Sequence, residues 1–219
     1  MSVLRLGVGG RVVGPSRRPD KALELYEFEA CPYCRKVREA LSALDLDVIV
    51  YPCPKGGERF RPKVRELGGK AQFPFLVDPN ANRSLYESSA IMSYLADAYG
   101  GGPLPLALRL GPLTTMGSSA ASGLRFARGV RARPSREPKR PLELWSYEAS
   151  PFCRLVRERL CELELPYLLH NVARGSSGRE AFVGRSGKMQ VPYLVDPNED
   201  RSLFESADII EYLERTYAG

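Results

Sequence analysis

The chain has 219 residues, of which 43% are hydrophobic, and a formal net charge of +6. No apolar run approaches the ~20 residues of a membrane-spanning helix, so we expect a soluble protein without a membrane span. The five cysteines are odd in number and do not form a disulfide framework, which favours a reducing compartment. We expect a cytoplasmic protein. An organelle stroma is the alternative, because residues 1–19 contain basic residues and no acidic ones, as a targeting segment would.

The positive charge lies outside two mildly acidic units. Residues 1–21, a basic N-terminal lead-in, carry +4, and residues 101–141, a basic linker, carry +7. Residues 22–100 carry −1 and residues 142–219 carry −4, and we expect each unit to be a domain. A domain of about 80 residues is at the small end of what buries a stable core alone, so we expect the two units to lean on each other or on the linker. Basic segments of this kind are usually solvated or packed against an acidic domain, with a membrane-surface or nucleic-acid contact as the alternative. We therefore expect no nucleic-acid partner.

The first unit is predicted to fold in the order β-α-β-α-β-β-α. Its first helix follows directly on a Cys-Pro-Tyr-Cys sequence, because Pro32 suits a first helical turn and apolar residues recur at spacings of three and four after it. Asp78-Pro79-Asn80 is a turn signal, so the strands beside it form a hairpin. The predicted strands are 23–28, 47–51, 73–77 and 84–86, and the predicted helices start at 32, 59 and 88.

The linker carries two apolar patterns. Leucines alternate at 104, 106, 108 and 110, which is typical of an extended strap. Leu113, Met116, Ala120 and Leu124 then recur at three and four, which indicates a helix of small residues.

The second unit repeats the first at an offset of 119 residues. The copies agree at 14 of 24 positions over residues 23–46 and at 16 of 28 over residues 72–99, with one residue missing from the second copy in between. The lead-in is repeated as well, since residues 133–138 resemble residues 14–19, so we expect each lead-in to pack on its own domain. The leading cysteine is not repeated, because Ser150 stands where the first copy has Cys31.

Three motifs occur in the same order in both units: Cys-Pro-Tyr-Cys (Ser-Pro-Phe-Cys in the second) on the first strand-to-helix turn, Gln-X-Pro before the third strand, and Glu-Ser at the start of the last helix. Together they resemble the glutaredoxin-like, thioredoxin-fold N-terminal domain of glutathione transferases, over about 155 of the 219 residues. The resemblance implies an α/β protein with two tandem thioredoxin folds, each with a mixed four-stranded sheet. We expect no all-helical C-terminal domain after either unit, and therefore no pocket of the usual kind for an electrophilic second substrate.

The resemblance also implies a glutathione site in each unit. In the family the proline is cis, the backbone before it pairs with the cysteinyl part of glutathione, and the Glu-Ser pair holds the γ-glutamyl group. A lysine two residues before each Gln offers a cation to a glutathione carboxylate, although the Glu-Ser pair could also be only a helix cap. The residues assigned in this way are Lys70, Phe73, Pro74, Glu87 and Ser88 in the first unit and Lys188, Val191, Pro192, Glu205 and Ser206 in the second.

The chemistry of the first unit centres on two thiols. The partial positive charge of a helix N-terminus lowers the pKa of a cysteine there, so Cys31 is placed to become a thiolate that attacks a disulfide. Cys34 lies within reach of the resulting mixed disulfide and could resolve it or tune Cys31. The alternatives are a glutathione-ligated iron–sulfur cluster held through Cys31, or two unreactive cysteines at a turn. A zinc site is not expected, because the chain has one histidine and no second Cys-X-X-Cys.

The second unit cannot carry out the same exchange. Ser150 could donate a hydrogen bond to a glutathione thiolate but cannot form a mixed disulfide. We therefore expect the second unit to bind glutathione or to be structural, with Cys153 as a monothiol nucleophile the less favoured alternative. Of the remaining candidates, Cys53 is expected to be a free loop thiol, Cys161 a boundary residue, and His170 a residue without an identifiable partner.

The sequence thus predicts a glutathione-dependent thiol–disulfide oxidoreductase that acts on a small-molecule or protein disulfide. The first unit would be redox-active, and no metal ligands are expected. A non-catalytic glutathione-binding or interaction module is the alternative, and a serine-type glutathione transferase acting through Ser150 is a third.

Overall fold

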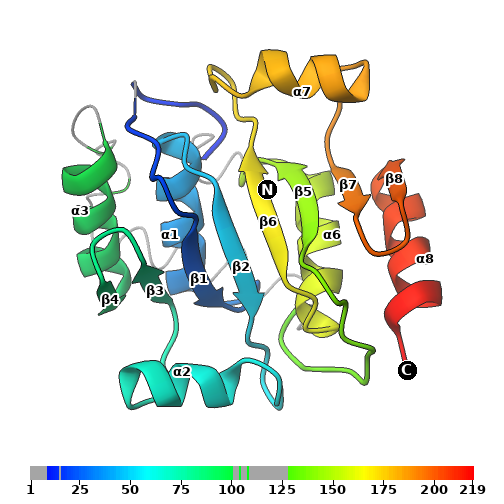
Figure 1. The fold of residues 1–219 in the computed structure, drawn as a ribbon, viewed down its shortest axis with the longest axis horizontal. Coiled ribbons are helices and arrows are strands. Elements are labelled where there is room, and N and C mark those ends of the chain that lie inside the picture. The colour runs from blue at the N-terminus through cyan, green and yellow to red at the C-terminus, as the bar shows by residue number, and fades with distance from the viewer. Residues whose placement is uncertain (1–8, 15, 101–103, 105–107, 109–127) are drawn as a thin grey trace.

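One continuous mixed sheet of eight strands runs through both copies in the computed structural model, which describes residues 9–14, 16–100, 104, 108 and 128–219 (Figure 1). We call residues 22–100 repeat 1 and residues 142–219 repeat 2. Repeat 1 contains β1 (Leu23–Glu27), α1 (Pro32–Ala43), β2 (Val48–Pro52), α2 (Arg61–Gly68), β3 (Phe75–Asp78), β4 (Arg83–Tyr86) and α3 (Ser88–Tyr99). Repeat 2 contains β5 (Leu142–Ser146), α6 (Pro151–Glu162), β6 (Tyr167–Asn171), α7 (Arg179–Ser186), β7 (Tyr193–Asp196), β8 (Arg201–Phe204) and α8 (Ser206–Tyr217).

Each repeat is a thioredoxin-like fold with the predicted element order. In repeat 1, β1 pairs in parallel with β2 and antiparallel with β3, and β3 and β4 form the predicted hairpin. Repeat 2 has the same pairings among β5, β6, β7 and β8. The prediction of two tandem thioredoxin folds, each with a mixed four-stranded sheet, is therefore confirmed.

The two four-stranded sheets meet where β2 pairs antiparallel with β6. Val50 lies opposite Tyr167 and Ile49 opposite Leu168, so each strand covers the hydrogen-bonding edge that the other would expose. The full strand order is β4-β3-β1-β2-β6-β5-β7-β8. The strands of repeat 2 therefore follow those of repeat 1 in mirrored order about the β2–β6 pair. The sequence did not indicate this arrangement of the repeats.

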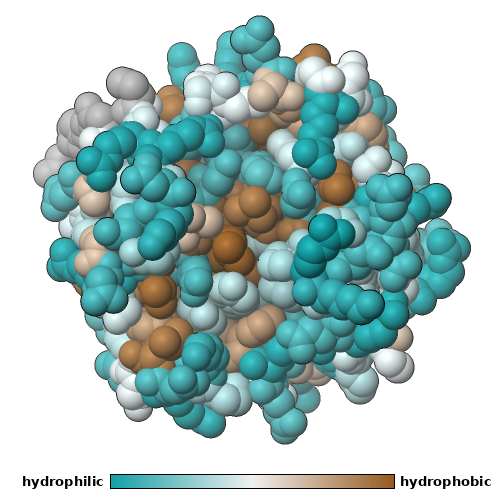
Figure 2. Space-filling view, in the orientation of Figure 1, coloured by the Kyte–Doolittle hydropathy of each residue, from teal (hydrophilic) through white to brown (hydrophobic). Residues whose placement is uncertain are grey.

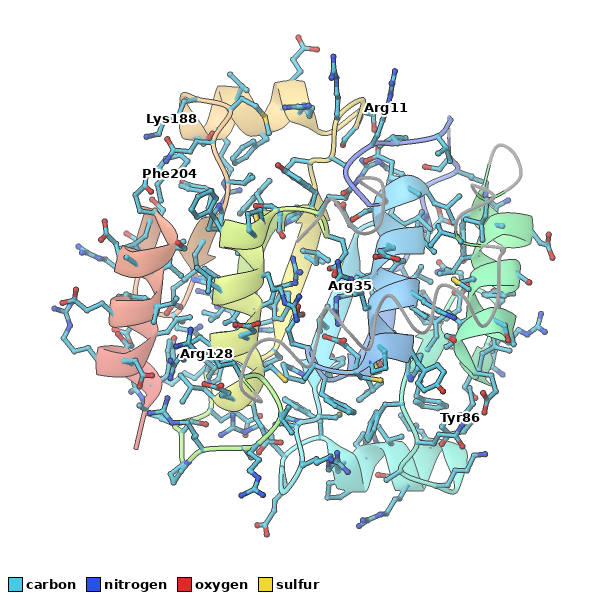
Figure 3. All side chains as sticks on the ribbon, turned by 180° about the vertical axis from the view of Figure 1, so that it is seen from behind. Arg11, Arg35, Tyr86, Arg128, Lys188 and Phe204 are labelled. Atoms are coloured by element: carbon cyan, nitrogen blue, oxygen red, sulfur yellow. The ribbon has the colours of Figure 1, made fainter. Side chains whose placement is uncertain are left out.

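The two faces of the sheet are covered differently. Helices α1, α3, α6 and α8 lie on one face (Figure 3), while α2 and α7 lie at opposite ends of the molecule (Figure 1). Side chains alternate between the faces of a strand, so Val48 and Val50 enter the core under the helices and Ile49 points the other way. Figure 2 shows the second face, with a hydrophobic patch at its centre and hydrophilic residues around it.

A single hydrophobic core extends under the helices of both repeats. It includes Leu25 and Leu41 of repeat 1 and Leu144 and Leu160 of repeat 2, all at most 1% exposed. A repeat of about 80 residues buries a marginal core by itself. The shared core and the joined sheet supply the burial that each repeat would lack.

Each lead-in contacts both repeats. The Arg17 amide donates to the Tyr99 carbonyl at 2.9 Å, which fastens the first lead-in to its own repeat as predicted. The same lead-in also crosses to repeat 2, where the Val12 amide donates to the Arg174 carbonyl at 2.9 Å. The second lead-in crosses in the opposite direction, since the Ala132 amide donates to the Lys55 carbonyl at 2.9 Å. The lead-ins therefore act as reciprocal straps between the repeats.

Little of the linker is among the described residues. Leu104 is half-buried and packs against the core, and Leu108 is buried there with helical backbone, so the expectation of an extended strand is wrong at Leu108. The expected helix over 113–124 lies outside the described residues. In the described part of the chain, every helix is too short or too polar to cross a membrane.

Candidate active site

Cys31 is the N-cap of α1, immediately after the turn that follows β1. Its backbone is extended (φ −72°, ψ 123°), and the Cys34 amide donates to its Sγ at 3.4 Å. Pro32 begins the helix and has no amide hydrogen that would need a partner there. Cys31 is 5% exposed and Cys34 is fully buried, whereas Tyr33 between them is exposed. Cys31 is therefore the less buried of the two cysteines.

The surroundings of Cys31 and Cys34 shift the pKa values of the two thiols in opposite directions. The Cys34 side chain, which hydrogen-bonds Cys31, lowers the pKa of Cys31 to about 7, with help from the Cys34 and Tyr33 amides and against the effect of burial. Burial and the neighbouring Cys31 raise the pKa of Cys34 well above its usual range. A pair of neighbouring groups whose pKa values are pushed apart in this way is typical of a site that uses one as nucleophile.

Ser150 occupies the same position in repeat 2. It is the N-cap of α6 with nearly identical backbone angles (φ −73°, ψ 121°), and its Oγ accepts from the Cys153 amide at 3.2 Å. Cys153 is fully buried, as Cys34 is. Repeat 2 therefore keeps the geometry of the turn but presents a hydroxyl where repeat 1 presents a thiol.

The two prolines that the resemblance assigns to glutathione follow cis peptide bonds, Phe73–Pro74 and Val191–Pro192. The Phe73 ring lies edge-on to the Phe28 ring at 6.2 Å between centroids, and the Arg61 guanidinium lies 4.9 Å above it. Phe28 is on the turn between β1 and Cys31, so this contact brings the Phe73–Pro74 segment beside the turn that carries Cys31.

Glu87 and Glu205 have unusual backbone conformations. Each precedes the first residue of the last helix in its repeat and has a positive φ, 65° for Glu87 and 61° for Glu205. Positive φ is uncommon outside glycine, and such residues are concentrated at functional sites. Gln72 donates a side-chain hydrogen bond to Glu87, and Gln190 does the same to Glu205. The sequence analysis treated these glutamines only as part of a motif and missed this pairing.

The predicted lysines lie beside the same helix starts. Lys70 Nζ lies 4.8 Å from the centre of the Tyr86 ring, and Lys188 Nζ lies 4.3 Å from that of Phe204, a contact visible in Figure 3. Tyr86 immediately precedes Glu87, and Phe204 immediately precedes Glu205. In each repeat the lysine therefore contacts the residue that precedes the Glu-Ser pair in the sequence. Ser88 itself is largely buried as the first residue of α3.

A buried network of ion pairs lies between α1 and α6, where Figure 3 shows Arg35. Arg38 contacts Glu148 at 3.0 Å and Glu29 at 3.3 Å, and Arg157 contacts Glu148 at 2.8 Å and Glu29 at 3.1 Å. Four arginines and four glutamates are related in pairs by the repeat: Arg35, Arg38, Glu29 and Glu39 in repeat 1, and Arg154, Arg157, Glu148 and Glu158 in repeat 2. Because partners cross between the repeats, each repeat completes the network of the other.

Glu27 is a fifth carboxylate in this network and has no acidic counterpart. It contacts Arg38 from the end of β1, while Ser146 stands at the equivalent position and accepts a hydrogen bond from Arg157 at 3.2 Å. Burial, together with Glu29 and Glu148, raises the pKa of Glu27 to about 8, against the effect of Arg38. Repeat 1 therefore holds, near Cys31, a buried acid with a raised pKa that repeat 2 lacks. The only signal in the sequence was that Glu27 and Cys31 are both replaced by serine in the second copy.

Three side expectations are corrected by the structure. Cys53 is fully buried against Tyr26 and Phe75, so it is not a free loop thiol, and burial raises its pKa. Cys161 was expected at the edge of the core of its own unit, but it is 2% exposed and contacts the other repeat, where the Glu29 amide donates to its Sγ at 3.4 Å. His170 does have partners, since its Nδ1 lies 3.2 Å from Asp47 Oδ2 of repeat 1.

All five cysteines are free. Within the described ranges, no group of three or more histidine, cysteine, aspartate or glutamate side chains is arranged to hold a metal ion.

A family model described as "Glutathione S-transferase, N-terminal domain" matches residues 25–103 and again residues 144–219. The two matches coincide with the two repeats. No curated protein matches the chain significantly.

Solved structures of glutathione transferases are similar to parts of the chain. BmGSTD1, a glutathione transferase of Bombyx mori, is 29% identical over 39% of this chain and 39% of its own, with a TM-score of 0.35. A delta-class glutathione transferase of Nilaparvata lugens is 34% identical over 36% of this chain and 37% of its own, with a TM-score of 0.32. TDR1, a trimeric glutathione transferase of Leishmania, is 12% identical over 91% of this chain and 68% of its own, with a TM-score of 0.32. The chain matches less than two fifths of the length of the two insect relatives.

Proposed function

Because the chain belongs to the family of glutathione S-transferase N-terminal domains and carries that domain twice, we propose that it is a glutathione-dependent thiol–disulfide oxidoreductase whose active repeat is repeat 1. The observation that carries this proposal is the difference between two neighbouring thiols. Cys31 caps α1 with a pKa lowered to about 7, whereas Cys34 is fully buried with a raised pKa. A glutathione-related function is common to the family, and the thiol–disulfide exchange is the specific part of the proposal.

The reaction proceeds by two thiolate displacements. The Cys31 thiolate attacks the glutathione sulfur of a mixed disulfide R–S–S–G, so that a Cys31–glutathione disulfide forms and R–S⁻ leaves and takes a proton from solvent. The thiolate of a second glutathione then attacks the glutathione sulfur of this intermediate. Glutathione disulfide leaves, and Cys31 is regenerated as a thiolate. One substrate disulfide is reduced and two glutathione units are joined, so electrons and atoms balance.

Cys34 gives the intermediate a second outcome. Its thiol lies one helical turn from Cys31 and, once deprotonated, can displace glutathione to form a Cys31–Cys34 disulfide. Because burial keeps Cys34 protonated near neutral pH, we assign it the slower route. The same step would serve a substrate with an internal disulfide, since Cys34 would break the Cys31–substrate mixed disulfide and release the substrate as a dithiol. Two glutathione molecules then reduce the Cys31–Cys34 disulfide.

We assign the binding of glutathione to the residues beside this turn. The backbone of Phe73, before the cis proline, would pair with the cysteinyl part, and Glu87 and Ser88 would hold the γ-glutamyl group. Support comes from the contact of Phe73 with Phe28 and from the positive φ of Glu87. Lys70 would meet a glutathione carboxylate, and its exposed position beside Tyr86 favours this.

Repeat 2 is assigned a glutathione-binding or structural role. Val191–Pro192 is cis and Glu205 has a positive φ, as in repeat 1, and Lys188 and Ser206 take the positions of Lys70 and Ser88. Ser150 keeps the capping geometry, which favours a second candidate function, conjugation of an electrophile to glutathione through a Ser150 hydrogen bond. The burial of Cys153 argues against a monothiol nucleophile there.

The test is reduction of a glutathionylated peptide by the full chain with glutathione as reductant. Cys31→Ser is expected to reduce turnover to the background of uncatalysed exchange, whereas Ser150→Ala is expected to leave turnover unchanged. Glutathione binding by the Cys31→Ser variant, measured by calorimetry, distinguishes a lost nucleophile from a lost site. If the parent protein binds glutathione but has no turnover, the non-catalytic binding module is the correct function. Conjugation of a model electrophile that falls in Ser150→Ala would support the transferase.

A further inference from the structure

A cavity of about 450 Å³ lies in repeat 2, on the face of the sheet that the four core helices leave uncovered. Its lining comes from β5, β6 and α7 and includes Trp145, His170, Gly178 and Phe182. The volume is in the range that holds small organic ligands. The cavity is separate from Cys31 and from every residue assigned to glutathione above.

Repeat 2 lacks the ring that repeat 1 has just before its second helix, and within that helix it has Phe182 in place of Val64. Phe60, the N-cap of α2, is mostly buried and packs on Tyr51 with ring centroids 5.2 Å apart. The equivalent residue before α7 is Gly178. A Cβ added to Gly178 would have its nearest contacts at 3.5–3.7 Å, which are ordinary van der Waals distances. The space that a phenyl ring fills in repeat 1 is therefore open in repeat 2.

One wall of the cavity is aromatic. The Trp145 indole is stacked with the His170 ring at 4.3 Å and with the Phe182 ring at 5.9 Å, with interplanar angles of 22° and 17°. His170 and Arg185 lie over the Trp145 ring. Trp145 is 7% exposed and Phe182 is 1% exposed, so the rings present mainly their edges to the cavity, and aromatic edges suit the π face of a planar ligand. In repeat 1 the residues equivalent to Trp145 and His170 are Tyr26 and Tyr51, which Phe60 helps to cover.

Two arginines bring hydrogen-bond donors to the cavity, and His170 Nε2 is buried there without a hydrogen-bond partner. Arg185 lies 4.8 Å above the Trp145 ring, and Arg18 reaches the cavity from the first lead-in. Each guanidinium has five N–H donors. The side chain of Arg18 is about half exposed, and its hydrogen bonds go to Asp47 and Ser177.

The carboxylate at the cavity is already engaged. Asp47 Oδ1 accepts from the Asn171 amide at 2.9 Å, and its Oδ2 lies 3.3 Å from Arg18 and 3.2 Å from His170. Arg185 lies 3.8 Å from Glu143, a distance that leaves its donors available for shorter contacts. A ligand would therefore meet guanidinium donors beside an aromatic wall.

We propose that this cavity binds a small planar aromatic carboxylate, with its ring against the edges of the Trp145 and His170 rings and its carboxylate on Arg185 and Arg18. Arginine binds a carboxylate by two parallel N–H···O bonds, which also fixes the orientation of the ligand. Arg18 and Asp47 come from outside repeat 2, so the complete site exists only in the tandem chain.

The chain offers a direct probe, because Trp145 is its only tryptophan. The full ¹⁵N-labelled protein is titrated with naphthalene-2-carboxylate while the single indole N–H signal is followed by NMR. We expect a saturable shift of that signal. The uncharged naphthalene-2-carboxamide is expected to bind at least about tenfold more weakly, because it lacks the charge that the guanidinium groups bind.

Two variants place the binding in this cavity. Gly178→Phe restores the ring of repeat 1 and is expected to abolish the shift, and the φ of −80° at Gly178 suits any residue. Arg185→Gln leaves the cavity open and is expected to weaken carboxylate binding about tenfold while changing carboxamide binding little. Both variants are expected to keep the thiol reactivity of Cys31, which serves as the check on folding.

The outcomes that overturn the proposal are distinct. Absence of a saturable shift with the parent protein shows that no such site exists. An unchanged affinity in Gly178→Phe places the ligand elsewhere, and equal affinities for the carboxylate and the carboxamide show that the ligand class is wrong. None of these outcomes depends on the oxidoreductase activity proposed above.

Discussion

Cys31 and Ser150 sit in the same turn with the same capping geometry and differ in one atom, sulfur or oxygen. A second difference accompanies the first, because the buried carboxyl of Glu27 becomes the hydroxyl of Ser146. The rest of the ion-pair network around them is paired across the repeats. Because of these two residue differences, repeat 2 lacks both the thiol and the buried acid of repeat 1, which supports assigning redox chemistry to repeat 1.

At this scale the second thiol can be tested separately from the first. Cys34→Ser is expected to keep most of the turnover on glutathionylated substrates, since a second glutathione can resolve the Cys31 intermediate. The variant should also accumulate one glutathione per chain on Cys31 when treated with glutathione disulfide, as measured by intact-protein mass spectrometry. Loss of turnover equal to that of Cys31→Ser would show that Cys34 is required for resolution instead.

Glu27 should affect stability in a direction set by its pKa. Its folded-state pKa is about 8 and its ordinary value is 4.5, so between these values the unfolded chain holds fewer protons and the free energy of unfolding falls as pH rises. Glu27→Gln removes that group, and we expect the variant to gain about 1–4 kcal/mol relative to the parent between pH 5 and 9. Urea unfolding at several pH values measures this. Ser146→Ala is the matched control, and a parallel pH profile for Glu27→Gln and the parent would contradict the assignment.

At the scale of elements, an aspartate fastens each hairpin to the last helix of its repeat. Asp78 Oδ2 accepts hydrogen bonds from Tyr94 at 2.6 Å and Tyr99 at 2.5 Å, and its Oδ1 accepts from the Asn80 amide at 2.8 Å. Asp196 makes the same contacts in repeat 2. The Asp-Pro-Asn turn thus both closes the hairpin and holds the helix that follows the Glu-Ser pair.

We expect Asp78→Ala to lower the free energy of unfolding by about 2–4 kcal/mol, because two tyrosine hydroxyls and an amide lose a buried acceptor. Against the effect of burial, hydrogen bonds from Tyr94 and Tyr99 lower the pKa of Asp78 below 3.8, so its contribution is present at neutral pH and is lost as pH falls through the lowered value. Asp97→Ala, an exposed change on the same helix, is the control. Equal stabilities of the two variants in urea would show that the aspartate contact is not stabilising.

The elements could be predicted well from the sequence, and their contacts could not. The amphipathic spacing after Pro32 and the turn signal at Asp78 located the first helix and the hairpin within one or two residues. The charged face of α1 is typical of a solvated helix, yet Arg38 and Glu39 are at most 1% exposed. Sequence spacing shows which residues share a face of a helix, but what covers that face depends on the other repeat.

At the scale of the whole molecule, the joining of β2 to β6 and the crossed ion pairs make the two repeats one unit. Neither followed from the sequence, because a strand such as β2 has the same alternating pattern whether its edge is free or paired. The small size of each unit predicted that the two would lean on each other or on the linker, and the repeated lead-in predicted packing on its own repeat. Neither predicted the joined strands or the crossing of the lead-ins. That the Cys31 and Ser150 motifs lie on strand-to-helix turns could be predicted because the motifs are local.

Because the repeats are coupled, we expect a substitution in repeat 2, far in sequence from Cys31, to lower the free energy of unfolding of the whole chain. Glu148→Gln leaves Arg38 and Arg157 short of a charged partner in a buried site, and we expect a loss of about 3 kcal/mol in unfolding free energy. Although burial opposes it, Arg157, Arg38 and Arg35 lower the pKa of Glu148 from 4.5 to about 2, so its stabilisation is lost between these values as pH falls. Glu199→Gln, which affects an exposed ion pair, should cost almost nothing. A similar small effect for both variants would mean that the network does not stabilise the joined repeats.

The central claim, that Cys31 is the reactive thiol of the whole molecule, is tested most directly by the pH dependence of alkylation of all five cysteines in the intact chain. Mass spectrometry reports Cys31, Cys34, Cys53, Cys153 and Cys161 separately, with and without prior treatment with glutathione disulfide. We expect Cys31 alone to react fast, with an apparent pKa near 7, and to be protected once glutathione is attached. Alkylation of all five at similar rates with an apparent pKa of about 8.5, the unperturbed value, would contradict the claim and favour the non-catalytic binding module.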